Sequence, residues 1–217
     1  MEKRTNRPDR SRARATEDKE KVREAIVNAG RQLLATEDPS KVSLRRIAAV
    51  AGYSPATVYN YFDDYRALYT AVRAHEMELA TSRFERIAAR TKDPEQRVRK
   101  LFLATAQYWL KHLDDFDLVF ALPAKKAADP AADPSPFGQS PTVMRALKVY
   151  YDAVDAYFST LPHPPIPPRL ATDTLMAAVH GIVAFPRMTR TMVWSDMETM
   201  AEIVIDGMLH RWNASAE

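Results

Sequence analysis

The chain has 217 residues, enough for one large domain or two small ones with a buried core. Apolar residues make up 46% and charged residues 27%, and there is no cysteine, so disulfides, thiolate metal sites and cysteine nucleophiles are excluded. The net charge of +3 lies within residues 1–65, which carry 13 Lys and Arg against 10 Asp and Glu, whereas the rest is balanced.

Several classes of function lack their sequence signals. No apolar run approaches the roughly 18 residues of a membrane helix, and no apolar segment follows the charged N-terminus, so we expect a cytoplasmic protein without a membrane partner. The five glycines form no phosphate-binding loop, and the five histidines are dispersed without metal-ligand spacing. We therefore expect no cofactor, no metal and no enzymatic activity.

Residues 1–15 form a strongly basic segment. Six Lys and Arg face only two acidic residues there. Such a segment is either a flexible arm that neutralises DNA phosphates or a solvated disordered tail, and composition leaves both open.

Three helices are predicted next. The first spans about 16–36, with Thr16 as N-cap and a helical stripe of apolar residues. A short helix follows from 44 to 50 with Ser43 as N-cap, and Gly52 suits the left-handed turn behind it. A third helix begins at Pro55, after the N-cap Ser54, and runs to about residue 61. This order predicts a helix-turn-helix within residues 16–65.

The remaining residues, 66–217, predict a larger helical domain. Prolines suggest a mobile loop at 123–141 and a polyproline-like strap at 161–168. With no alternating β-branched runs, the chain is predicted to be all-α, with about nine helices. The six helices of this domain are expected at about 65–91, 95–112, 114–122, 142–160, 169–190 and 196–213.

Residues 42–69 carry the most specific signal, with the sequence VSLRRIAAVAGYSPATVYNYFDDYRALY. This segment resembles the DNA-binding domain of the TetR family of bacterial transcription regulators, and the resemblance extends over about 20–70. Two positions depart from the family pattern. Arg46 stands where an acidic residue is common, and Tyr65 replaces a lysine that usually contacts phosphate, for which Arg66 is a candidate substitute.

The third helix suits the major groove of DNA. Pro55, Ala56 and the Thr57 methyl can meet thymine methyl groups, while Arg45 can reach a guanine edge. Phe62 is expected in the core, and Tyr59 and Tyr61 are either DNA contacts or core residues. The candidate DNA-binding residues are Ser43, Arg45, Ser54, Pro55, Ala56, Thr57, Tyr59, Asn60, Tyr61 and Arg66.

The larger domain contains aromatic residues that either line a ligand cavity or simply pack a core. The segment Val179-His180-Gly181 is similar to the Trp-His-Gly signature of one TetR C-terminal class, with valine in place of tryptophan. His180 faces a ligand or is a satisfied core histidine, and close helix packing is expected at Gly181. The candidate ligand-binding residues are Tyr108, Trp109, Phe120, Tyr150, Met176 and His180.

The resemblance implies a ligand-responsive regulator, most simply a repressor that binds a palindromic double-stranded DNA operator as a homodimer. The last two helices carry apolar stripes wider than one core-facing surface needs, so we expect the dimer to form through them. An unidentified small molecule would be the effector. The alternative is a helical enzyme or small-molecule carrier that does not bind DNA.

Overall fold

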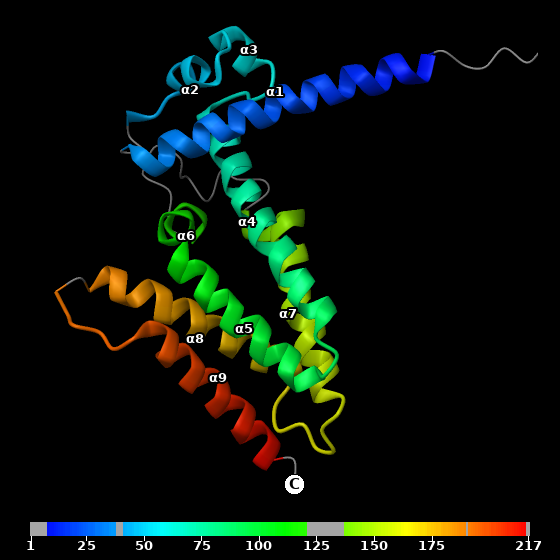
Figure 1. Cartoon of the computed structure of the whole chain (residues 1–217), viewed down its shortest axis with the longest axis vertical. Helices are drawn as coiled ribbons and strands as arrows, with labels where there is room; N and C mark the ends of the chain where they lie inside the picture. The colour runs from blue at the N-terminus through cyan, green and yellow to red at the C-terminus, as the bar shows by residue number, and fades with distance from the viewer. Residues whose placement is uncertain (1–7, 38–40, 121–136, 190, 216–217) are drawn as a thin grey trace, which may run out of the picture. The chain divides into compact units, whose positions relative to one another are not determined.

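The computed structural model describes residues 8–37, 41–120, 137–189 and 191–215. All regular structure in these ranges is helical, which confirms the predicted all-α fold (Figure 1). Two compact units are present, and the boundary between them lies inside helix α4, after His75. The helices are α1 (Pro8–Thr36), α2 (Leu44–Ala51), α3 (Pro55–Tyr59), α4 (Tyr65–Arg90), α5 (Pro94–Lys111), α6 (Leu113–Phe120), α7 (Pro141–Phe158), α8 (Pro168–Met188) and α9 (Met197–Ala214), with a 3-10 helix, η3 (Phe137–Gln139), before α7.

Helix α1 begins earlier than the sequence predicted. The predicted start and N-cap at Thr16 are wrong, because α1 starts at Pro8 and continues through Thr16. The physical reason is local. Proline is well placed in a first helical turn, Asp9 suits the positive end of the helix dipole, and the Arg and Ala residues of 10–15 are strong helix formers. The second half of the predicted flexible arm is therefore helical, and residues 1–7 lie outside the described residues.

The N-terminal unit has its own apolar core. Helix α1 packs against α2, and α2 packs against α3. Gly30 brings α1 close to α4, since a Cβ at this position would lie 3.2 Å from Cγ2 of Val72. The buried apolar residues of this unit are Ile26, Val27, Ala29, Leu33, Val42, Leu44, Ile47, Ala48, Val58, Phe62, Leu68 and Val72.

Gly52 ends α2 with a φ of 76°, in the left-handed region that favours glycine. We expect Gly52→Ala to lower the free energy of unfolding by about 1–2 kcal/mol, because the added Cβ penalises this backbone conformation. No described atom lies within 4 Å of that Cβ, so steric crowding adds nothing. Chemical denaturation of the variant measures the effect. Gly138→Ala is the matched control, since its site is equally open and its φ lies outside the left-handed range. An equal loss in both variants would contradict the argument.

Helix α5 is the central helix of the second unit. It packs against α7, α8 and α9, and α8 also contacts both α7 and α9, as Figure 1 shows for the side-by-side α5, α8 and α9. The core of this unit is strongly aromatic, because its largest fully buried side chains are those of Trp109, Tyr157, Phe102 and Phe158. Such side chains bury large apolar areas and dominate the stability of a small core.

Side-chain caps and prolines set the helix boundaries of the second unit. Asp93 accepts a hydrogen bond from the Gln96 N–H at 2.8 Å, and Asp196 accepts one from Thr199 at 2.7 Å, which confirms both predicted helix starts. Residues 161–167 are non-helical, as predicted for the strap, but its last residue, Pro168, begins α8, because proline is well suited to the first turn of a helix. The predicted loop at 123–141 lies largely outside the described residues, and its described end forms η3 and the start of α7. In the ranges described, no helix combines the length and apolarity that crossing a membrane requires.

Candidate functional site

The α2–α3 turn of the N-terminal unit is held by two serine caps. Ser43 Oγ accepts the Arg46 N–H at 3.3 Å at the start of α2, and Ser54 Oγ accepts the Thr57 N–H at 3.0 Å at the start of α3. Ser54 Oγ also lies 2.9 Å from Thr57 Oγ1. These bonds satisfy N–H groups that have no partner within the helix. The predicted caps and the turn between the two helices are confirmed.

Helix α3 is anchored by one buried residue and exposes most of the others. Val58 is fully buried, whereas Pro55, Ala56 and Asn60 are exposed. Tyr59 is 52% exposed, so it is not a core residue, and Phe62 is buried as predicted. Thr57 and Tyr61 are half-buried. The structure therefore places Pro55, Ala56 and Thr57 on one short helix, with Pro55 and Ala56 exposed.

The charged residues around this helix pair differ in their surroundings. Arg45 is exposed on α2. Arg46, which stands where an acidic residue is common in the family, forms an ion pair with Glu37. Its Nη2 lies 2.6 Å from Glu37 Oε1. Tyr65 stacks on Tyr69 with ring centroids 6.1 Å apart, and burial raises the pKa of Tyr65 to about 12. Arg66 beside it is half-buried.

A cavity of about 420 Å³ lies within the second unit, in the size range of small-molecule sites. It includes five of the six predicted ligand-binding residues, and Tyr108 is the exception. The Tyr108 ring instead lies against Phe84 and His112, at centroid distances of 5.7 and 4.5 Å. The lining residues are Met77, Phe84, Trp109, Phe120, Val143, Ala146, Leu147, Tyr150, Asp173, Met176, Ala177 and His180.

The sequence-based prediction did not include the aliphatic, small and acidic residues of this lining, nor the aromatic Phe84. Four lining residues of α7 and four of α8 each follow the spacing i, i+3, i+4 and i+7, which places them on one face of a helix. This periodicity is visible in the sequence, but it also marks an ordinary core face. A selection based mainly on aromatic residue type therefore identified only part of the lining.

His180 is both satisfied within its helix and part of the cavity wall. Its Nδ1 lies 2.9 Å from the Met176 carbonyl oxygen, and burial lowers the pKa of the imidazole. Its neighbour Val179 is fully buried. The expectation of close helix packing at Gly181 is wrong for the described chain, since no atom lies within 4 Å of a Cβ built there.

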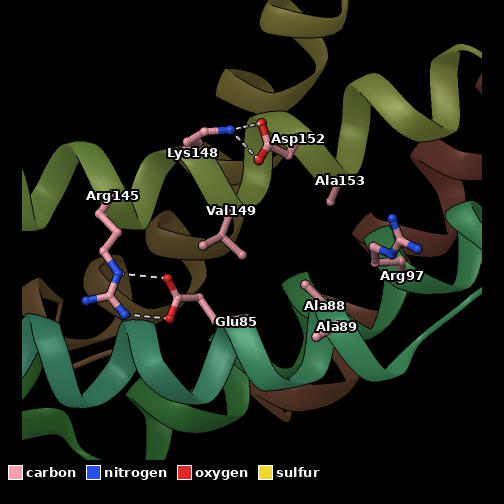
Figure 2. A pocket seen from close by; sticks show the side chains of 9 residues that line it. All are labelled: Glu85, Ala88, Ala89, Arg97, Arg145, Lys148, Val149, Asp152 and Ala153. Atoms are coloured by element: carbon pink, nitrogen blue, oxygen red, sulfur yellow. Dashed lines mark hydrogen bonds and ion pairs between the residues drawn. The ribbon is translucent and has the colours of Figure 1, made fainter.

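A second concavity, of about 380 Å³, is lined by charged residues of α4, α5 and α7 (Figure 2). Arg145 bridges Glu85 and Glu78, and this pairing lowers the pKa of Glu85. Lys148 pairs with Asp152 at 2.6 Å. Arg145 and Lys148 are thus paired with carboxylates, whereas Arg97 donates to the carbonyl oxygens of Thr91 and Lys92, so each of these cations already has a partner. Among the described residues, no group of three or more His, Asp or Glu side chains could hold a metal ion.

A buried three-helix core, a capped glycine turn and an exposed short helix define a helix-turn-helix DNA-binding domain. Residues 26–72 match the family model described as bacterial regulatory proteins, tetR family. The N-terminal unit thus matches the helix-turn-helix domain of the TetR family of bacterial regulatory proteins.

Solved structures of the same fold extend the likeness to most of the chain. A TetR family transcription regulator from Marinobacter aquaeolei VT8 is 21% identical, with 90% of this chain and 97% of that chain covered and a TM-score of 0.63. NalD, the secondary repressor of the MexAB-OprM multidrug efflux pump in Pseudomonas aeruginosa, is 21% identical, with 89% and 96% covered and a TM-score of 0.60.

A third similar structure is that of the transcriptional regulator FadR from Bacillus subtilis in complex with stearoyl-CoA. It is 15% identical, with 86% of this chain and 97% of that chain covered and a TM-score of 0.63. No curated protein matches the chain.

Proposed function

We propose that the chain is a dimeric repressor that binds a palindromic operator and leaves it when a small molecule occupies the cavity. The observation that carries the proposal is the presence, in one chain, of an exposed helix-turn-helix and a separate aromatic cavity. NalD is named as a repressor and FadR was solved with stearoyl-CoA, which supports repression and effector binding for this fold. Such a regulator works in the cytoplasm, where bacterial DNA lies, and catalyses no reaction.

Helix α3 is the proposed recognition helix. Its exposed Pro55 and Ala56, together with Thr57, suit thymine methyl groups in the major groove. Tyr59, Asn60 and Tyr61 suit phosphate oxygens, as does Arg66 at the start of α4. Ser43 and Ser54 place two helix N-termini, whose N–H groups and dipoles favour phosphate, on the same unit.

Arg45 is proposed to read a base. We expect Arg45→Ala to reduce operator affinity by about 1–3 kcal/mol and to relax preference at one base position, because a bidentate contact to guanine is lost. Competition titrations with operators substituted at single positions measure this change. Lys41→Ala is the control, since Lys41 is an exposed cation just before α2. An equal loss of affinity on every operator sequence would indicate that Arg45 contacts phosphate and does not read a base.

The basic start of α1 is proposed to follow the DNA backbone. Replacing Arg10, Arg12 and Arg14 with Gln keeps helix propensity and removes three charges. We expect the slope of log affinity against log salt to become shallower by up to about 2.7 for each protomer, if each arginine neutralises one phosphate. The matched Arg→Lys variant keeps the charges and should retain the slope. An unchanged slope in the Gln variant would make this segment a solvated helix.

The proposed dimer forms through α8 and α9. On these helices Phe185 is 52% exposed, Met188 78% and Ile203 67%. Gly181 and Gly207 are helical, exposed and open, although glycine costs about 1 kcal/mol relative to alanine inside a helix. Glycine at these positions would let a helix of a second copy pack closely, and this contact would offset the lower helix propensity. The inward stripe of α9, which includes Ala201, Ile205 and Leu209, is buried in its own unit.

Helix α4 is proposed to carry the effector signal. Leu68 and Val72 near its start are buried in the N-terminal unit, whereas Met77 and Phe84 line the cavity. A ligand against Met77 and Phe84 would shift α4 and change the spacing of the two recognition helices. Successive major grooves require about 34–36 Å between them. A coupling of about 1–3 kcal/mol is typical of such regulation.

The direct test is selection of fragments of the chain's own genome by the purified protein, followed by sequencing. We expect the retained fragments to share an inverted repeat, with binding that weakens steeply as salt rises. Retention without any shared repeat would contradict a palindromic operator. Absence of retention would favour the alternative, a helical carrier or enzyme.

A further inference from the structure

We propose that the cavity of the second unit selects an apolar organic molecule whose polar end donates hydrogen bonds, such as an alcohol or an amine, and rejects carboxylates. This inference rests on the proposed function, because it names the class of effector that would occupy the cavity. The shape of the cavity, the hydrogen-bonding state of its polar side chains and its charges together favour such a ligand.

The shape of the cavity suits an apolar body. Val143, Ala146 and Leu147 of α7 face the cavity, as do Met176 and Ala177 of α8. Aromatic rings from four other positions complete the wall, and those of Phe84, Trp109 and Tyr150 are almost fully buried. A ligand in this space gains affinity chiefly by burying apolar surface.

His180 presents an acceptor rather than a donor. The Met176 carbonyl oxygen, 2.9 Å from Nδ1, can only accept, so Nδ1 carries the ring proton. Burial lowers the pKa of His180, which keeps the imidazole neutral at pH 7. Phe120 packs edge-on against the ring, with centroids 4.9 Å apart. The remaining nitrogen, Nε2, is therefore a lone-pair acceptor in apolar surroundings.

The hydroxyl proton of Tyr150 is also used in a hydrogen bond within the protein. Thr105 Oγ1 lies 2.8 Å from the Leu101 carbonyl oxygen, which can only accept, so the single hydroxyl proton of Thr105 is used there. Tyr150 must then donate in its 2.8 Å hydrogen bond to Thr105. Burial raises the pKa of Tyr150, so the phenol stays protonated near pH 7. A ligand thus meets no free O–H donor on this side chain.

The charges of the lining disfavour an anion. Asp173 is the only charged lining residue among those described, and its carboxylate accepts the Tyr151 hydroxyl at 2.8 Å. Arg169 lies 3.7 Å from the other oxygen of Asp173, with its side chain 78% exposed to screening solvent. The indole N–H of Trp109 is a single neutral donor. A ligand carboxylate would lose hydration in this apolar lining without a compensating cation, which is costly, and the half-exposed Asp173 would add a weaker, solvent-screened repulsion.

Calorimetry with four compounds that share one apolar body tests the proposal: phenylbutanol, phenylbutylamine, phenylbutanoate and butylbenzene. We expect the alcohol and the amine to bind at least about 10-fold more tightly than phenylbutanoate, the equivalent of one well-made hydrogen bond. His180→Phe keeps an aromatic ring and removes Nε2, so it should weaken phenylbutanol about 10-fold and leave butylbenzene unchanged. His163→Phe, in the exposed strap, is the matched control.

Two further variants keep the test decisive. Ala177→Trp fills the cavity from an exposed helix position and should abolish binding of all four compounds. If His180→Phe does not fold, Asp173→Asn replaces it, since Asp173 is exposed. This variant should weaken the binding of phenylbutylamine and reduce the ratio of its affinity to that of phenylbutanoate. Phenylbutanoate binding as tightly as the alcohol, binding that survives Ala177→Trp, or no binding by any compound would each overturn the proposal.

The proposed effector class and the proposed regulatory function are tested by different experiments. Operator binding is measured separately, by gel shift on DNA fragments retained from the genome. A protein that retains DNA but prefers phenylbutanoate refutes the effector class alone. A protein that prefers phenylbutanol but retains no fragment refutes the regulatory function alone.

Discussion

Ile203→Asp is expected to convert the protein to a monomer and to weaken operator binding on the order of 10²- to 10⁴-fold. Ile203 is 67% exposed on α9, so a carboxylate there leaves the core of its own unit intact. In an interface between two copies the same carboxylate would be buried without a partner, at a cost of several kcal/mol. Each recognition helix would then bind its half-site alone and lose the gain from linkage. Light scattering and operator titration measure both effects.

Two companion variants test the location of the interface. Phe185→Asp on α8 should act like Ile203→Asp, because Phe185 belongs to the same proposed interface and is 52% exposed. Met144→Asp is the control, since Met144 is a similarly exposed apolar residue on α7, at 53%. A monomeric Ile203→Asp protein that keeps tight operator binding would refute the dimer mechanism. A monomeric wild-type protein would refute the interface itself.

Tyr59→Ala should weaken operator binding by about 100-fold while the fold stays intact. Because Tyr59 is 52% exposed, its removal should change the free energy of unfolding by no more than about 0.5 kcal/mol. A hydrogen bond to a charged phosphate contributes about 1.5 kcal/mol, and a dimer loses it twice, which together correspond to this change in affinity. Gel-shift titration with operator DNA, alongside thermal unfolding, measures the two quantities.

The conservative variant separates the hydroxyl of Tyr59 from its ring. If the hydroxyl bonds phosphate, Tyr59→Phe should lose nearly as much affinity as Tyr59→Ala. Retention of affinity by Tyr59→Phe alone would assign the contact to the ring. Full affinity in a well-folded Tyr59→Ala protein would remove Tyr59 from the DNA interface.

The helix-turn-helix was predictable because its signals are local. Ser43 and Ser54 cap helices through residues three positions away, and Gly52 needs only its own backbone angle. The start of α1 is also a local property, yet it was predicted wrongly. The charges of residues 8–15 suggested a disordered arm and outweighed their strong helix propensity.

The cavity was less predictable because its members come from five helices far apart in the sequence. Tyr108 and Trp109 are neighbours on α5, and only packing against other helices decides that Trp109 faces the cavity while Tyr108 meets Phe84. Asp173 was missed because an acidic residue on a helix usually faces solvent. Its place in the lining follows from the packing of α8 against α7.

By itself, the sequence determined the all-α class, most helix ends and the DNA-binding turn, because capping, proline geometry and apolar periodicity act within a few residues. It also marked α8 and α9 as having more apolar surface than one core needs. Only the tertiary structure decided which face of α9 is buried, with Ile205 inside and Ile203 outside, and which residues enclose the cavity. The physical reason is that burial depends on how helices from distant parts of the chain pack, and side-chain periodicity alone does not specify the neighbour.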